Sequence, residues 1–286
     1  FLLMLYGPLQ SLINGQQAEH ISIRDRGFQY GDGCFETIRV LANEPILWPA
    51  HLKRLKQACK TLHLSVDLEL LQSEVSQLLQ VNKAADVILK ITVTRGEGGR
   101  GYTPPEQADC VRIIQLINYA APDTNNGARV VVCQHRLSSN SLLAGIKHLN
   151  RLDQALASAQ IPAGFAEGLC MDEVGTVIEG CKSNLLLTID NELVTPDLSK
   201  CGVEGVMLNH LIDEFQGLGT RVLKKTISLS DLNTASEIFL CNSVFGIWPV
   251  AEIKNENDDR RVSKREGSFT KTVLEIQRKL FQDNTR

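Results

Sequence analysis

Lys147 lies in the stretch SLLAGIKHLNRLDQAL, directly after the small and apolar run LLAGI. A lysine beside apolar residues usually reaches the surface from the end of a strand or helix. Apolar surroundings also lower the pKa of an ammonium group, which favours the neutral amine that forms Schiff bases and accepts protons. Lys147 is therefore either an ordinary surface residue or the chemical centre of the protein.

A glycine-rich motif, GEGGRG at 96–101, follows a strand-like run and has the G-x-G-x-x-G spacing of dinucleotide-binding proteins. That fingerprint requires a helix directly after the glycines, because the helix N-terminus meets the pyrophosphate. Here YTPPEQ follows, and its two prolines prevent a helix from starting. We therefore expect a turn that carries Arg95, Arg100 and Tyr102 to a site.

Eight cysteines are scattered along the chain with no CxxC pair and no histidine at metal-ligand spacing. They are Cys34, Cys59, Cys110, Cys133, Cys170, Cys181, Cys201 and Cys241. This distribution is typical of reduced, mostly structural thiols in a cytoplasmic protein. The sequence predicts neither a metal site nor a disulfide framework.

The composition is that of a soluble globular protein, with 43% hydrophobic and 22% charged residues and a net charge of −3 over 286 residues. No apolar run approaches the roughly 20 residues of a membrane span, and the charge gives no sign of nucleic-acid binding. The apolar start FLLMLYGPLQSLI has no basic flank or small-residue cleavage site, which argues against a signal peptide. We expect no nucleic-acid or membrane partner, and we treat 1–11 as a candidate extension.

Hydrophobic periodicity predicts two α+β units. The smaller N-terminal α/β domain, 1–118, contains short strands, a helix near Pro49, a helix at DLELLQSEVSQLLQ and two further strands at DVILKITVTRG and DCVRIIQLINY. Residues 119–127 cluster Pro, Asp, Asn and Gly and predict a linker. The larger domain, 128–286, is predicted to contain hairpins, a helix at about 150–160, a helix at GVMLNHLIDEFQGLG and a last helix at SFTKTVLEIQRKLFQ.

Six motifs occur in the order seen in the fold-type-IV pyridoxal-phosphate enzymes, and the chain resembles this family over nearly all of its length beyond residue 11. They are LINGQQAEHISIRDRGFQYGDGCFETIRV, HLKRL, GIKHLNRL, VIEGCKSNLLL, GVEGVM and FLCNSVFGIWPV. The family includes branched-chain and D-amino-acid aminotransferases and lyases of 4-amino-4-deoxychorismate, and GGRGY together with AGIKHLNRL is most similar to the lyases. The resemblance implies a two-domain α+β fold whose larger domain has a barrel-like β core and binds pyridoxal 5'-phosphate.

The resemblance also implies a set of cofactor-binding residues. Lys147 would form the Schiff base, and Glu179 would lie opposite the pyridine nitrogen and keep it protonated. The cofactor phosphate would be bound by Arg54, by the backbone amides of Val206 and Met207, and by Ser243. The aminotransferases usually carry threonines where this chain has Met207 and Ser243.

Five further residues match positions on the substrate side. Tyr30, Phe35 and Thr37 match pocket-lining positions, while Arg100 and Tyr102 match a loop that binds the substrate carboxylate in the D-amino-acid relatives. Thr37 would donate a proton to the leaving group. His148, next to the lysine, is expected to orient or pack rather than to act as an acid or base.

The resemblance implies a carbon–oxygen lyase that converts 4-amino-4-deoxychorismate to 4-aminobenzoate and pyruvate, in folate biosynthesis. It also implies a cytoplasmic homodimer with the loop around Arg100 near the subunit boundary. Two alternatives stay open: an aminotransferase of the same fold, and a protein that binds the cofactor without turnover. The presence of both Lys147 and Glu179 argues against the second.

Overall fold

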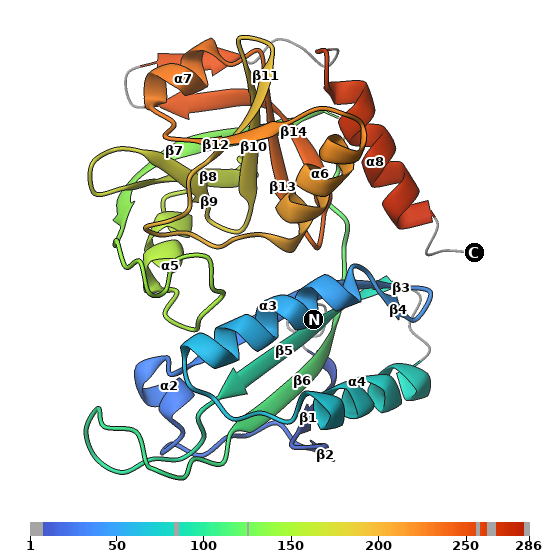
Figure 1. The fold of residues 1–286 in the computed structure, drawn as a ribbon, viewed down its shortest axis with the longest axis vertical. Helices are drawn as coiled ribbons and strands as arrows, with labels where there is room; N and C mark the ends of the chain where they lie inside the picture. The colour runs from blue at the N-terminus through green and yellow to red at the C-terminus, as the bar shows by residue number, and fades with distance from the viewer. Residues whose placement is uncertain (1–7, 83–85, 125, 256–257, 262–266, 283–286) are drawn as a thin grey trace. The chain divides into compact units, whose positions relative to one another are not determined.

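The computed structural model of the protein describes residues 8–82, 86–124, 126–255, 258–261 and 267–282. The chain forms two compact units. Unit 1 comprises 1–120, 146–150 and 281–286, and unit 2 comprises 121–145 and 151–280. Each unit combines one sheet with helices (Figure 1), which confirms the predicted α+β fold in two parts. The chain passes between the units at 120–121, inside the predicted linker, and returns to unit 1 for the short segment that carries Lys147.

Unit 1 is built on a six-stranded antiparallel sheet in the order β2-β1-β6-β5-β3-β4. The strands are β1 (Pro8–Ile13), β2 (Gln16–Gln17), β3 (Gly33–Leu41), β4 (Glu44–Pro45), β5 (Asp86–Thr94) and β6 (Val111–Asn118). Asn14 and Gly15 join β1 to β2 with φ angles of 49° and 78°, the left-handed conformation that an Asn-Gly hairpin turn requires. Of the candidate extension 1–11, residues 1–7 lie outside the described residues and the remainder belongs to β1.

Three helices belong to unit 1: α2 (Arg26–Tyr30), α3 (Trp48–Thr61) and α4 (Leu68–Asn82). Pro49 lies in the first turn of α3, as predicted. Along β3 the side chains alternate, so that Glu36 and Ile38 are buried while Phe35 and Thr37 are only partly buried. Because Glu36 bonds to side chains of α3, Phe35 and Thr37 lie on the opposite face of the sheet.

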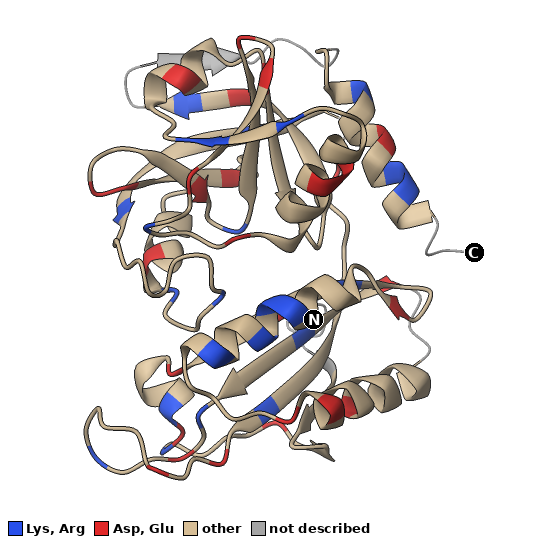
Figure 2. Ribbon diagram, viewed as in Figure 1, with Lys and Arg blue, Asp and Glu red and all other residues tan. Residues whose placement is uncertain are grey.

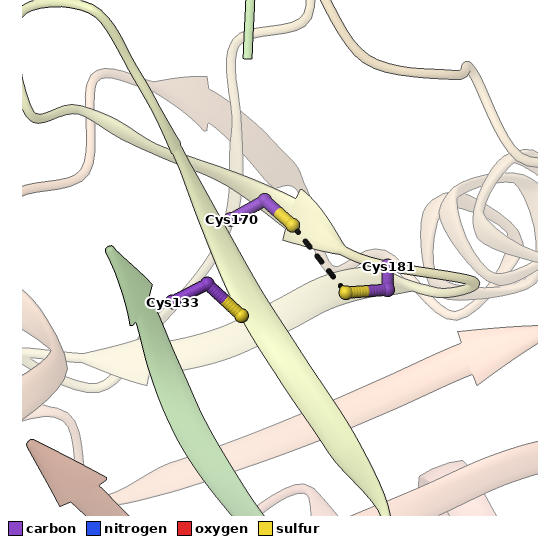
Figure 3. Close-up of side chains that lie close together, drawn as sticks. All are labelled: Cys133, Cys170 and Cys181. Carbon is purple, nitrogen blue, oxygen red and sulfur yellow. Dashed lines mark hydrogen bonds between the residues drawn. The ribbon is translucent and has the colours of Figure 1, made fainter. Parts of the chain in front are cut away.

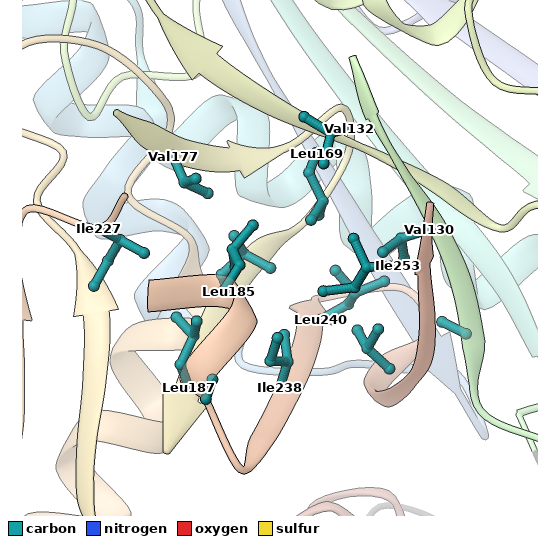
Figure 4. Close-up of a cluster of buried hydrophobic side chains, with 14 of the residues drawn as sticks. Val130, Val132, Leu169, Val177, Leu185, Leu187, Ile227, Ile238, Leu240 and Ile253 are labelled. Carbon is teal, nitrogen blue, oxygen red and sulfur yellow. The ribbon is translucent and has the colours of Figure 1, made fainter. Parts of the chain in front are cut away.

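Unit 2 contains a nine-stranded mixed sheet in the order β12-β11-β10-β13-β14-β7-β8-β9, with β15 paired to β14. The strands are β7 (Ala128–Leu137), β8 (Glu167–Asp172), β9 (Val177–Gly180), β10 (Asn184–Ile189), β11 (Glu192–Pro196), β12 (Val222–Lys225), β13 (Glu237–Asn242), β14 (Gly246–Asn255) and β15 (Asp258–Arg261). Figure 4 shows apolar side chains from β7, β8, β9, β10, β13 and β14 meeting in one cluster. The sheet therefore curls around this main core, which agrees with the predicted barrel-like β core.

Four helices complete the described part of the chain: α5 (Leu152–Ser158), α6 (Val206–Gly217), α7 (Leu229–Thr234) and α8 (Thr270–Gln282). The sequence predicted α5, α6 and α8 but not α7, a six-residue helix whose start is a capping box between Ser228 and Asp231. It also missed the short β15, whose sequence DDRR has no strand periodicity. Residues 95–110 contain no helix, which confirms that GEGGRG is not a dinucleotide-binding turn. None of the described helices has both the length and the apolar character needed to cross a membrane.

Candidate active site

Lys147 is held beside the first residues of β3. The amide of Phe35 donates to the carbonyl of Lys147 at 2.9 Å, and the amide of Leu149 donates to the carbonyl of Gly33 at 2.9 Å. The backbone of His148 forms an antiparallel bridge with Cys34 between these two bonds. The Nζ atom of Lys147 lies 4.5 Å from the centroid of the Phe35 ring. The lysine is therefore half-buried over the face of the sheet opposite α3, the open face, rather than extended into solvent.

A second lysine, which the sequence analysis did not select, lies over the same ring. Lys90 is the register partner of Thr37, and its Nζ atom is 5.8 Å from the Phe35 centroid. Within the described residues no acidic side chain forms an ion pair with Lys90. The sequence could have indicated Lys90, because it is the one lysine inside the otherwise mostly apolar strand DVILKITVTRG. Phe35, Thr37 and the two amines therefore share one face of unit 1.

Arg54 is fixed by a buried carboxylate. Its Nε and Nη2 atoms donate to Glu36 at 2.8 and 2.6 Å, and Nδ1 of His51 lies 2.6 Å from the same carboxylate. Burial alone would raise the pKa of Glu36, but the charge and hydrogen bonds of Arg54, with those of His51, lower it to about 2. Burial also lowers the pKa of His51, and the positive charges of Arg54 and Lys147 lower it further, against the opposing effect of Glu36. Arg54 is thus oriented before any ligand arrives.

The surroundings of Arg54 contain two features that the sequence analysis missed. The Nε2 atom of His51 is buried and has no hydrogen-bond partner among the described residues. The helix that carries both residues, α3, also contains Lys53, Lys56 and Lys60 and has no acidic residue. Figure 2 shows the blue Lys and Arg segments along this helix. This end of the unit is therefore suited to bind an anion.

The glycine-rich loop is anchored by Arg26, another residue that the sequence analysis missed. Its guanidinium donates to the carbonyls of Gly101 and Tyr102 at 3.1 and 2.7 Å and pairs with Asp32. The rings of Tyr30 and Tyr102 meet edge to face, with centroids 5.5 Å apart. The structure thus joins two of the predicted substrate residues, while Arg100 is exposed on the same loop.

Glu179 lies on β9 in unit 2, with only 3% of its surface exposed. The amide of Val203 donates to its Oε2 atom at 2.8 Å, and the Nε2 atom of Gln154 donates to its Oε1 atom at 3.2 Å. Gly145 pairs with Val203, one residue before the chain returns to unit 1. The carboxylate is therefore held rigidly, and Gln154 and Val203 are the supporting residues that the sequence did not indicate.

The N-terminus of α6 has no side-chain cap. Its N-cap residue is Gly205, where a Cβ atom would lie 1.9 Å from Oδ1 of Asn184. Val206 and Met207 have buried side chains, so only their backbone amides can serve a ligand. This agrees with the chain having a methionine where the aminotransferases usually have a hydroxyl. Ser243 is half-buried in the turn between β13 and β14.

The predicted cofactor residues are divided between the two units. Lys147 and Arg54 belong to unit 1, and Glu179, Val206, Met207 and Ser243 belong to unit 2. The amine and the oriented guanidinium of unit 1 suit an aldehyde and a phosphate. The uncapped helix N-terminus and the buried carboxylate of unit 2 suit a phosphate and a protonated ring nitrogen. These are the groups that pyridoxal phosphate carries, so the residues of each unit fit that cofactor chemically, and the role of each residue stays a prediction.

The chain is similar to one family of known proteins, and its relatives carry the names of two types of enzyme. Residues 33–253 match the family described as amino-transferase class IV. The aminodeoxychorismate lyase of Vibrio harveyi is 35% identical over 249 residues, which is 84% of this chain and 90% of that protein. The crystal structure of 4-amino-4-deoxychorismate lyase from Pseudomonas aeruginosa has a TM-score of 0.87 and 42% identity, covering 94% of this chain and 98% of that one.

The putative branched-chain-amino-acid aminotransferase of Methanocaldococcus jannaschii is 31% identical over 89% of both chains. The relatives thus include both the lyases and the aminotransferases that the sequence motifs indicated. The family match spans well over half of the chain, and it includes Phe35, Lys147 and Glu179. The chain belongs to the amino-transferase class IV family.

Proposed function

We propose that the protein is a pyridoxal-phosphate-dependent lyase that converts 4-amino-4-deoxychorismate to 4-aminobenzoate and pyruvate. Support comes from the similarity to lyases of Vibrio harveyi and Pseudomonas aeruginosa over most of both chains. The observation that carries the proposal is the arrangement on the open face of unit 1, where Phe35 lies beneath Lys147 and Thr37 occupies the next outward position of the same strand.

Lys147 would attach the cofactor covalently, and Arg54, the amides at the start of α6 and Ser243 would hold its phosphate. Glu179 would hold a proton on the ring nitrogen, and its two neutral donors, Val203 and Gln154, keep the carboxylate in place for that task. When bound, the cofactor supplies an electron sink for the substrate carbon that carries the amine.

Two side chains of unit 1 would move the protons. The amine of Lys147 takes the proton from the carbon that carries the substrate amine, and the ring of Phe35 keeps this amine on the open face of the sheet. The hydroxyl of Thr37 donates a proton to the oxygen of the departing enolpyruvyl group. Loss of this group makes the ring aromatic, so the side chains mainly have to orient the two reacting bonds.

The substrate carries two carboxylates, and the protein offers several groups to receive them. Lys90 has no acidic ion-pair partner in the described part of the chain and is the register partner of Thr37, so it is suited to bind the carboxylate of the leaving group. Tyr30, Tyr102 and Arg100, on the segments anchored by Arg26, would bind the other carboxylate.

An aminotransferase of the same fold is the alternative, because the relative from Methanocaldococcus jannaschii carries that name. The deciding experiment offers the purified protein 4-amino-4-deoxychorismate and measures pyruvate release, with transfer of an amino group to a 2-oxo acid measured in parallel. We expect pyruvate release to be the faster reaction. Faster amino-group transfer would replace the lyase by the aminotransferase.

Thr37→Val tests the proton donor, since it keeps the shape of the side chain and removes the hydroxyl. We expect pyruvate release to fall by roughly 10² to 10⁴, the usual effect of a general acid, with cofactor binding unchanged. Thr61→Val, on α3 of the same unit, is the control and should keep full activity. An unchanged rate in Thr37→Val would remove this residue from the mechanism.

We further infer a cytoplasmic homodimer with the loop around Arg100 near the subunit boundary. The eight cysteines form no disulfide, in accordance with a reducing compartment. Sedimentation of the active enzyme should give twice the chain mass, and a fully active monomer would contradict the dimer.

A further inference from the structure

Three thiols meet on one side of the sheet of unit 2 (Figure 3). Cys133 comes from β7, Cys170 from β8, and Cys181 from the residue directly after β9. Their sulfur atoms all lie within 4.8 Å of one another, and the Sγ atoms of Cys170 and Cys181 are 3.7 Å apart. The strands β7, β8 and β9 are neighbours in the sheet, so this cluster is built by strand pairing. None of these residues has a role in the proposed reaction.

Local backbone features make room for the three sulfurs. Side chains alternate along β7 and β8, so Val132 and Leu169 pack into the main core while Cys133 and Cys170 pack into a separate cluster on the other face. At Gly168 a Cβ atom would lie 2.5 Å from Sγ of Cys133 and 3.0 Å from Sγ of Cys181. Any other residue at 168 would push these two thiols away.

The spacing matches that of thiolates around a soft metal ion. With metal–sulfur bonds of about 2.3 Å, sulfurs in tetrahedral or trigonal sites are roughly 3.8 to 4.0 Å apart. The observed separations need shifts of about 1 Å or less to reach this value. Thiolates select soft ions such as Cu(I), Zn²⁺ and Cd²⁺ over Mg²⁺ or Ca²⁺.

We propose that Cys133, Cys170 and Cys181 form a binding site for one soft d¹⁰ metal ion. Binding of such an ion replaces the thiol protons, so the three cysteines bind as thiolates. Cys181 is partly exposed, whereas Cys133 and Cys170 are buried, so the ion enters from its side. The sequence analysis predicted no metal site because the three ligands come from distant segments.

The site adjoins the carboxylate that the proposed function assigns to the cofactor nitrogen. Cys170 is the register partner of Glu179, and Cys181 follows Glu179 by two residues. Directly paired residues of neighbouring strands have Cβ atoms about 5 Å apart. A bound ion that draws Cys133 towards Cys170 and Cys181 therefore pulls on the strand pair that carries Glu179, and turnover is expected to fall when the site is filled. This second expectation rests on the proposed function.

Cadmium is the probe, because its thiolate complexes absorb in the near ultraviolet. The reduced, cofactor-loaded protein is titrated with Cd²⁺ without oxygen, against a competing chelator, with Mg²⁺ as the hard-ion control. We expect one tight equivalent with thiolate charge-transfer absorption and release of protons. Cys181→Ser should weaken this equivalent by at least roughly 100-fold, and Cys133→Ser gives a second test if that variant folds poorly.

Two other variants separate this site from its rivals. Cys110→Ser removes a thiol of unit 1, outside the cluster, and should leave the tight equivalent intact. Cys59→Ser breaks the two-thiol pair with Cys34, whose sulfurs are 3.8 Å apart, and should also leave it intact. The site is overturned if Cd²⁺ binds only at millimolar concentration, or if the tight equivalent disappears in Cys59→Ser and persists in Cys181→Ser. Tight binding with unchanged turnover overturns only the link to Glu179.

Discussion

At the scale of single residues, the two lysines over Phe35 are expected to have separate tasks. Lys147→Ala should abolish turnover, because it removes both the covalent anchor and the proton acceptor. Borohydride reduction followed by peptide mass analysis should place the cofactor on Lys147. Recovery of the label on Lys90 or Lys182 would contradict the assignment.

Lys90→Met keeps an unbranched chain of similar length and removes the charge. Losing a charge-assisted hydrogen bond of about 1.5 to 3 kcal/mol predicts a rise in KM of roughly 10- to 100-fold, with a smaller change in kcat. Lys90→Arg should restore much of the affinity. Equal KM values in Lys90→Met and the parent protein would show that this lysine does not touch the substrate.

Glu179→Gln keeps the acceptor for the amide of Val203, so the fold should remain intact. A neutral amide cannot hold a proton on the ring nitrogen, and proton removal should slow by roughly 100-fold or more. Glu192→Gln, at an exposed glutamate paired with Lys225, is the control. Near-normal activity of Glu179→Gln in single-turnover kinetics would show that Glu179 does not hold the proton on the ring nitrogen of the cofactor.

At the scale of elements, α6 provides a matched pair of glycines. Gly205→Ala would place a methyl group 1.9 Å from Oδ1 of Asn184, so the start of the helix must shift. The cost of overpacking is typically about 1 to 3 kcal/mol, and displaced amides should weaken cofactor binding by about tenfold or more. Titration of the apoprotein with pyridoxal phosphate measures this loss.

Gly217→Ala lies in the last turn of the same helix and meets no atom within 4 Å. It should leave cofactor affinity unchanged and add about 0.4 to 1 kcal/mol of stability, because alanine restricts the unfolded chain. Equal cofactor affinity in the two variants would show that the start of α6 does not bind the phosphate.

At the scale of the whole molecule, two buried carboxyls set opposite limits on stability. Burial raises the pKa of Glu167 to about 7, against the opposing charge of Lys182. Between pH 4.5 and 7 the carboxyl of Glu167 is still protonated in the folded protein but already ionised in the unfolded chain. Its contribution to the free energy of unfolding is therefore fully present below about pH 4.5 and is lost as pH rises to about 7. Because Arg54 and His51 lower the pKa of Glu36 to about 2, its contribution is present above about pH 4.5 and is lost as pH falls towards 2.

Glu167→Gln should therefore make the free energy of unfolding less dependent on pH between about pH 4.5 and pH 7. The shift from 4.5 to about 7 corresponds to about 3 kcal/mol between pH 4 and pH 8. Urea unfolding across this range should show that loss in the parent protein and in the control Glu106→Gln, an exposed loop residue, but not in Glu167→Gln. An identical pH dependence in all three proteins would contradict the buried-carboxyl account.

Local patterns in the sequence determined most of the elements and indicated the candidate residues of the site. The period of 3.6 residues and Pro49 predicted α3, and alternating β-type runs predicted β5 and β6, because these signals depend on neighbours within one or two turns of chain. The motifs around Lys147 and Glu179 selected these two residues as candidates without reference to any contact. Short elements such as α7 and β15 escaped because they are stabilised by one cap or by one partner strand.

Only the tertiary structure decided which side chains work together. Lys90 and Lys147 meet over Phe35, although 57 residues separate the two lysines, because β3 pairs with β5 on one side and with the segment at 147–149 on the other. Sheet register likewise brings Cys133, Cys170 and Cys181 to one point. Such pairings depend on which strands are neighbours and on a register that a single bulge can change, and neither is written in the local periodicity of the chain.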